Sequence, residues 1–134
     1  MIKAVLDTNI LISGLFWKGL PRRIVDLASA QRFQSFTSVE ILRELEAVLI
    51  EDFPDIPYAK ITDILRDTLS YSQVVITEKI FIKHLRDLSD TKVIACAFAA
   101  EADYIVTGDK DILSLKEIKR IRIITARIFW EILA

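Results

Sequence analysis

The sequence predicts an α/β fold, namely a three-layer α/β/α sandwich around a central parallel sheet of four to five strands. Short apolar runs alternate with helical segments along the 134 residues, which is the pattern of parallel strands joined by crossover helices. The helical segment from about 90 to 101 is apolar on almost all sides, so other elements must cover it. A chain of this length fits one domain over residues 1–134.

Five apolar runs have the length of buried strands. They cover residues 2–6, 33–37, 73–77, 104–106 and 121–124. Between them, Pro21 suits the first turn of a helix, and Ser38 and Thr125 are residue types that cap helix starts. The helices expected from these signals and from apolar spacing cover residues 21–30, 39–49, 58–69, 90–101 and the segment after 125.

Composition limits the classes of function. Lys and Arg number 18 against 19 Asp and Glu, and a formal net charge of -1 gives no long-range attraction to nucleic acid. Any polyanion must therefore be held by a local group of cations or by bound metal. The single cysteine, Cys96, excludes an intrachain disulfide, and the single histidine, His84, argues against a zinc site of Cys and His.

Two features of hydropathy bear on location and assembly. No run approaches the roughly 20 apolar residues of a membrane span, and the chain starts with a predicted strand rather than a signal peptide. We therefore expect a cytoplasmic protein with no membrane partner. The mean hydropathy of +0.36, with Phe16 and Trp17 in a segment flanked by glycines, favours a homodimer that covers part of this surface.

Four acidic residues are expected at one edge of the sheet. Asp7 directly follows the first predicted strand, and Asp109 closes the Thr107-Gly108-Asp109 segment after the fourth. Glu44 lies in the second turn of the helix after the second strand. Asp90 lies in the first turn of the apolar helix. The carboxyl ends of parallel strands share an edge, and the helices that follow them start there, so connectivity alone brings the four acids together.

Several carboxylates in one crevice repel each other unless a cation or a shared proton joins them. Mg²⁺ or Mn²⁺ suits such a site, because both prefer oxygen ligands. Bound metal lowers the pKa of water and neutralises charge on a phosphate, so metal-assisted hydrolysis of a phosphodiester is the leading chemistry. Each acid also has a structural alternative: Asp7 as a helix cap, Asp90 and Asp111 as partners of a helix dipole, and Asp109 as a turn residue.

The acids stand within four motifs. They are residues 5–13 (VLDTNILIS), 37–45 (TSVEILREL), 90–97 (DTKVIACA) and 102–111 (ADYIVTGDKD). In this order they resemble the motifs of PIN domains over nearly the whole chain, and the chain looks most like the toxin-type, VapC-like ribonucleases of prokaryotic toxin–antitoxin pairs. The resemblance implies a PIN-like fold, Mg²⁺ or Mn²⁺ held by acids, endonuclease action on RNA, a homodimer and a small antitoxin partner.

The resemblance also implies roles for single residues. Asp7, Glu44 and Asp109 match acidic positions of the family and are expected to be catalytic and to bind metal. Asn9 matches a polar residue that supports the metal shell, and Thr107 matches the small hydroxyl residue before the last acid. Asp111 is predicted to support the site.

The third motif departs from the pattern of many relatives, which place an acid where this chain has Thr91. We expect Asp90, one residue earlier, to take that role, with Asp87 close by as a supporting residue. The alternative is a weakened metal site, and with it a catalytically weak or inactive PIN-fold protein that binds RNA or acts as a scaffold.

Contacts to RNA are predicted for basic side chains, since phosphates need cations. Arg22, Arg23 and Lys110 are the candidate nucleic-acid-binding residues. Further cations that are plausible contacts lie toward the C-terminus, although a solvated surface role is their structural alternative. They are Lys116, Lys119, Arg120, Arg122 and Arg127.

Overall fold

The computed structural model describes residues 1–82 and 91–134 of the chain. Within this part, six strands form one sheet in the order β3-β2-β1-β4-β6-β5. The strands are β1 (Lys3–Leu6), β2 (Gln34–Thr37), β3 (Ser72–Val74), β4 (Tyr104–Val106), β5 (Glu117–Ile118) and β6 (Ile121–Ile124). All pairs are parallel except β5 with β6, so five strands end at the same edge, which we call the carboxyl edge.

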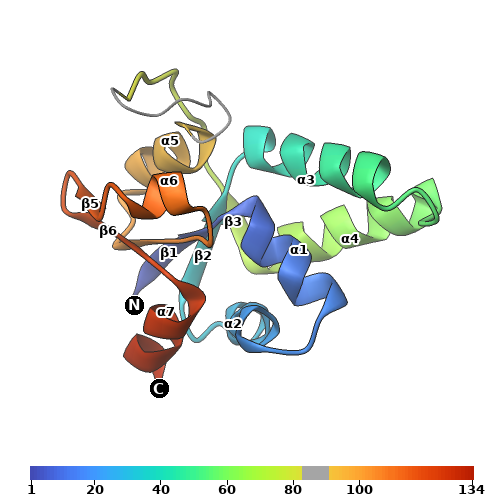
Figure 1. Ribbon diagram of the computed structural model, residues 1–134, viewed down its shortest axis with the longest axis horizontal. Coiled ribbons are helices and arrows are strands. Elements are labelled where there is room, and N and C mark those ends of the chain that lie inside the picture. The colour runs from blue at the N-terminus through green and yellow to red at the C-terminus, as the bar shows by residue number, and fades with distance from the viewer. Residues whose placement is uncertain (83–90) are drawn as a thin grey trace.

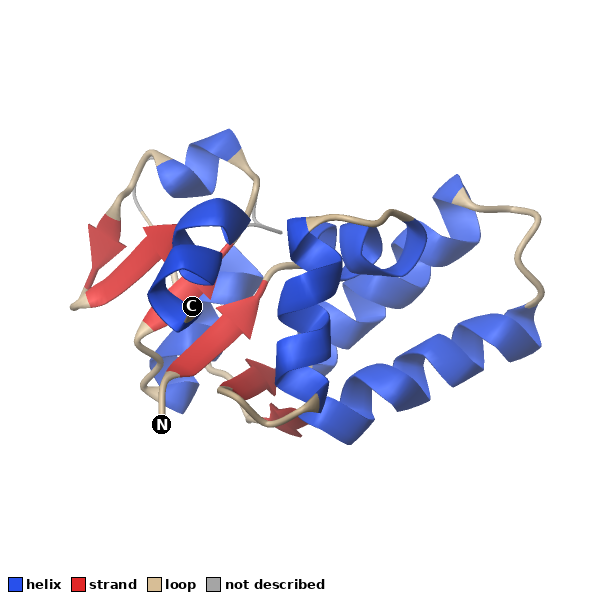
Figure 2. Cartoon of the chain, turned by 90° about the horizontal axis from the view of Figure 1, so that it is seen from below, coloured by secondary structure: helices blue, strands red, loops and turns tan. Residues whose placement is uncertain are grey.

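The helices surround this sheet (Figure 1). They are α1 (Thr8–Phe16), α2 (Leu20–Ser29), α3 (Val39–Asp52), α4 (Tyr58–Tyr71), α5 (Thr91–Ala100), α6 (Lys110–Leu113) and α7 (Ala126–Leu133). α5 packs against β1, β2 and β4 on one face, and α2 and α7 pack together on the other, as the view from below shows (Figure 2). The predicted α/β/α sandwich with a mainly parallel central sheet is therefore confirmed.

The core explains why these segments are strands and helices. β1 is buried along most of its length, with Val5 paired to Phe36 on β2 and to Ile105 on β4. α5 buries apolar residues on most of its sides, including Ile94 and Cys96, as its sequence requires. No helix in residues 1–82 or 91–134 is long and apolar enough to cross a membrane.

Three parts of the fold differ from the prediction. Residues 8–16, for which no helix was predicted, form α1, because the helix is capped by Asp7 and buries apolar side chains such as Ile10 and Ile12. β5 adds a short antiparallel strand at the sheet edge. The third strand is also shorter than expected, since it covers only Ser72–Val74.

Candidate active site

Asp7 is placed by the end of β1 and the start of α1. Its backbone N–H donates to the carbonyl of Val106 on β4 at 3.0 Å, which extends the sheet pairing by one residue. Its carboxylate accepts hydrogen bonds from the backbone N–H of Thr8 at 2.7 Å and from the hydroxyl of Thr107 at 2.6 Å. The side chain is only 9% exposed, so it is held in one orientation at the carboxyl edge.

The ionisation of Asp7 is shifted by this position. Burial raises the pKa of its carboxyl group, and the two hydrogen bonds from Thr107 and Thr8 oppose that shift. The negative charges of Glu44 and Asp109 raise the Asp7 pKa further. Glu44 and Asp109 therefore each lie near enough to Asp7 for their charges to act on it, and a cation beside Asp7 would relieve that repulsion.

Glu44 is joined to the start of α1. The hydroxyl of Thr8, itself buried, donates to Glu44 Oε2 at 2.8 Å. The Glu44 side chain is half-buried. Glu40, one turn earlier on α3, is also half-buried and accepts from the hydroxyl of Thr77 at 2.8 Å.

Thr107 links the two aspartates. Its buried hydroxyl donates to Asp7 Oδ2 and accepts from the backbone N–H of Asp109 at 3.0 Å. Asp109 Oδ1 accepts from the N–H groups of Asp111 and Ile112, at 2.8 and 3.1 Å, so Asp109 caps α6. The capping role and a metal-binding role are compatible, since a carboxylate has two oxygens and about four lone-pair sites.

Asn9 supports the same edge from the first turn of α1. Its Oδ1 accepts from the N–H of Gly108 at 3.2 Å, and its Nδ2 donates to Asp7 Oδ2 at 3.4 Å. Asn9 and Thr107 thus both donate to Asp7 Oδ2, whereas the backbone N–H of Thr8 donates to Asp7 Oδ1.

The other predicted site residues lie on α6 beside Asp109, lie on α2, or fall outside the described residues. Asp111 and Lys110 are exposed on α6. Arg22 lines a cavity beside Tyr71 at the end of α4, and the Arg23 guanidinium lies 5.7 Å above the ring of Trp130 on α7. α2, which carries both arginines, lies below the sheet in Figure 1, whereas α3, α5 and α6 lie above.

The third motif is described only from Thr91 onward, where it forms the first part of α5. Asp90, Asp87 and His84 lie outside the described residues. Within residues 1–82 and 91–134, no three Asp, Glu, His or Cys side chains gather closely enough to hold one metal ion. The candidate ligands that the structure describes, Asp7, Glu44 and Asp109, nevertheless all offer carboxylate oxygens. A buried carboxylate beside two other acids suits a hard cation such as Mg²⁺.

Two polar side chains at this edge were not predicted. Thr8 joins Asp7 to Glu44 through its N–H and hydroxyl, and the only sequence signal is its place directly after Asp7. Thr37, at the end of β2, is 2% exposed, and its hydroxyl has no hydrogen-bond partner among the described residues. An unpartnered buried hydroxyl costs free energy and has no sequence signal.

Comparisons with known proteins agree with this architecture. A family model described as PIN domain matches residues 3–111. An uncharacterized protein of Methanocaldococcus jannaschii is 33% identical over 119 residues, which covers 87% of this chain and 76% of that protein. The fold is also similar to a chain in the crystal structure of VapBC2 from Rickettsia felis bound to a DNA fragment from their promoter. That match has a TM-score of 0.63 and 15% identity, and it covers 92% of this chain and 98% of that one.

Proposed function

The chain belongs to the PIN domain family, and on that premise we propose that it is a metal-dependent endoribonuclease, the toxin of a toxin–antitoxin pair. The observation that carries the proposal is the burial of Asp7 within reach of the charges of Glu44 and Asp109, at the edge where five parallel strands end. Ligands of parallel α/β folds bind at this edge.

Asp7 and Asp109, with Glu44 or Asp90, are the proposed ligands of Mg²⁺ or Mn²⁺. Such a metal supplies a water of lowered pKa and positive charge near the phosphate. Thr107 and Asn9 orient the Asp7 carboxylate, and Thr8 orients Glu44. With a metal bound there, Glu44 or Asp90 would accept a proton from the attacking water.

The proposed partners are RNA as substrate, a small antitoxin protein, and a second copy of the chain. Trp17 is 58% exposed at the end of α1, so it is available to a partner. Phe16 is half-buried, because its ring stacks on Phe53 with centroids 4.3 Å apart. We expect Trp17 rather than Phe16 to contribute to the homodimer. Light scattering at tens of micromolar tests whether the dimer forms, since a monomeric mass contradicts it.

The function is tested by cleavage of a labelled single-stranded RNA with purified protein in Mn²⁺, Mg²⁺ or EDTA. We expect cleavage with either metal and none in EDTA. The matched variants are Asp7→Asn in the cluster and Asp55→Asn, an exposed carboxylate in the turn after α3. Cleavage that survives EDTA, or that Asp7→Asn and Asp55→Asn change equally, contradicts the metal mechanism.

A folded protein that binds RNA but cleaves none under these conditions supports the alternative function of an inactive RNA-binding or scaffold protein. The position of Asp90 relative to Thr91 is the sequence feature that motivates this alternative.

A further inference from the structure

The turn between β5 and β6 carries an unusual pair of residues. β5 and β6 pair through Ile118 and Ile121, so Lys119 and Arg120 are the two loop residues of a β-hairpin. Both have positive φ, 47° and 70°. Hairpin turns with positive φ at both central positions favour Asn-Gly or Gly-Gly, because residues with bulky side chains are strained there. The chain instead holds two long cationic side chains in this conformation.

The other residues with positive φ have an ordinary explanation. Gln31, Glu101 and Lys116 follow closely after the ends of α2, α5 and α6, where a left-handed residue commonly closes a helix. The Lys119-Arg120 turn is therefore the one place in the described residues where positive φ outside glycine is not explained by a helix end. Strained backbone that is kept without a local structural reason points to a function.

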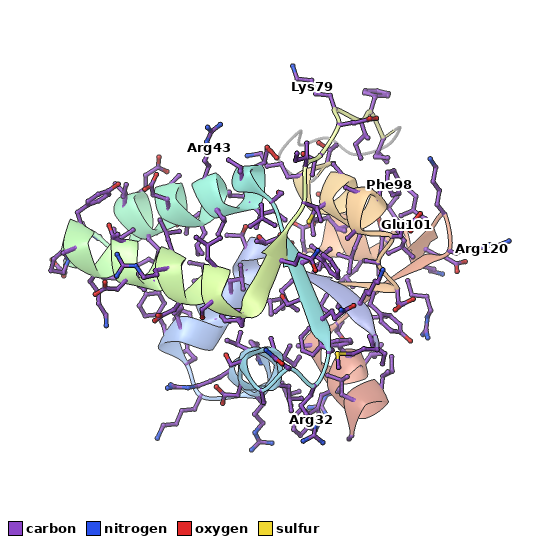
Figure 3. The ribbon with its side chains drawn as sticks, turned by 180° about the vertical axis from the view of Figure 1, so that it is seen from behind. Arg32, Arg43, Lys79, Phe98, Glu101 and Arg120 are labelled. Atoms are coloured by element: carbon purple, nitrogen blue, oxygen red, sulfur yellow. The ribbon has the colours of Figure 1, made fainter. Side chains whose placement is uncertain are left out.

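The same hairpin concentrates positive charge. Residues 116–122 contain four cations and one acid, Glu117, although the whole chain has a net charge of -1. All four cations are exposed. They are Lys116, Lys119, Arg120 and Arg122, which we call the basic hairpin. Figure 3 shows Arg120 extending outward from the hairpin.

Aromatic rings hold two of these cations without neutralising them. Lys119 Nζ lies 4.7 Å from the centroid of the Phe98 ring, and the Arg122 guanidinium lies 5.9 Å from that of Tyr104. A cation–π contact positions a charge but leaves it available to an anion. The ion pair found among the described residues, Arg66 with Asp63, involves none of the four.

The turn of the basic hairpin lies away from the carboxyl edge, although Lys116 lies opposite Ile123, one residue from that edge. Arg122 pairs with Tyr104 at the start of β4, and the turn at 119–120 lies beyond that row. Ile124 at the carboxyl edge lies four positions after Arg120, which is about 13 Å along a strand. A ligand that contacts both regions must be extended and must carry negative charge along its length.

We propose that the basic hairpin binds backbone phosphates of single-stranded RNA, several nucleotides away from the scissile bond. This inference rests on the proposed nuclease function. A cluster of carboxylates repels an incoming polyanion, and the overall charge of the chain does not attract one, so a separate group of cations must supply the electrostatic part of RNA binding. The exposed cations of the hairpin meet that need.

The test measures binding of a labelled 20-nucleotide oligouridine in EDTA as a function of salt. The double variant Lys119→Asn with Arg120→Gly removes two charges and installs the residue pair that this turn prefers, so the protein stays folded. Each lost contact to a single strand lowers the slope of log K against log salt by about 0.7. We expect a slope shallower by about 1.4 and binding weakened roughly tenfold at 0.1 M salt.

The control variant carries Lys18→Gln and Lys60→Gln, two exposed lysines before α2 and on α4. It loses the same charge, and we expect it to keep the slope of the wild-type protein. Equal slopes in the two double variants, or no RNA binding by the wild-type protein, overturns the proposal. A shallower slope in the hairpin variant alone, combined with a wild-type protein that cleaves no RNA in Mn²⁺, supports the basic hairpin and contradicts the nuclease function.

Discussion

The carboxyl edge and the basic hairpin use opposite means to present charge. At the carboxyl edge, Asp7 is buried and fixed by hydrogen bonds from Thr107, Thr8 and Asn9. At the hairpin, Lys119 and Arg120 are exposed on a strained turn. Burying a charge fixes its position but lowers the free energy of unfolding. An exposed charge has little effect on stability, and its side chain is less strongly oriented.

This difference indicates which property each region controls. Changes at the carboxyl edge should alter the chemical step and the stability of the fold together, because the same hydrogen bonds serve both. Changes at the hairpin should alter RNA affinity and its salt dependence while the chemical step and the fold persist. The predictions that follow test this division.

The largest expected effect is on cleavage by variants of the two aspartates. Asp7→Asn and Asp109→Asn should each nearly abolish single-turnover cleavage of one labelled RNA, because each removes charge from the proposed metal site. Asp55→Asn, an exposed carboxylate outside the cluster, is the matched control and should cleave almost normally. Equal losses in Asp109→Asn and Asp55→Asn, with folding intact by circular dichroism, argue against Asp109 as a ligand.

A smaller loss is expected when the support of Asp7 is removed. Thr107→Val deletes the 2.6 Å hydrogen bond to Asp7 Oδ2 while keeping the side-chain shape. We expect metal affinity or activity to fall by about 10- to 100-fold, the usual effect of losing a partner of a metal ligand. Thr107→Ser keeps the hydroxyl and should retain most activity, so equal defects in the two variants would point to packing instead.

The pH dependence of stability gives a third test. Burial raises the pKa of Asp7 in the folded state, so the stability linked to this group is present below the ordinary pKa of 3.8 and is lost as pH rises through the raised value. Without metal, Asp7→Asn should therefore unfold at higher urea than the wild-type protein at neutral pH. The difference in urea midpoint between Asp7→Asn and the wild-type protein should shrink at low pH, where Asp7 is protonated. A difference that stays constant at all pH values would contradict a link between Asp7 ionisation and stability.

The smallest expected effect concerns Thr37. Its buried hydroxyl has no partner among the described residues, so Thr37→Val should stabilise the protein by about 1 kcal/mol. For a domain of this size that corresponds to about 2–4 °C in Tm. Thr68→Val is the control, because the Thr68 hydroxyl donates to Ile64 and its loss should not stabilise. A lower Tm for Thr37→Val would contradict this expectation, because it would indicate that the Thr37 hydroxyl makes a stabilising hydrogen bond in solution.

Most of the fold could be predicted because apolar strand-length runs alternate with helical segments along the whole chain, which is the pattern of a parallel sheet with crossover helices. α1 was missed because it buries apolar residues on several sides and shows little amphipathic period. β5 was missed because two residues, Glu117–Ile118, carry no periodicity. The conformation of the Lys119-Arg120 turn was equally hidden, since neither residue is typical of it.

For the candidate site, connectivity alone predicted that Asp7, Glu44 and Asp109 share one edge. The hydrogen bond from Thr8 to Glu44 and the unpartnered hydroxyl of Thr37 depend on side-chain conformations, which no sequence pattern specifies. The role expected of Asp90 stays a prediction, because the residue lies outside the described part of the chain.

The central claim, that the carboxylate cluster binds a divalent metal, is tested most directly by thermal unfolding with increasing Mn²⁺. A ligand at 100 times its Kd stabilises the folded state by about 2.7 kcal/mol, so the Tm of the wild-type protein should rise with Mn²⁺. The rise should be much smaller in Asp7→Asn and unchanged in Asp55→Asn. Identical Mn²⁺-induced shifts in the wild-type protein and Asp7→Asn would contradict a metal site built around Asp7.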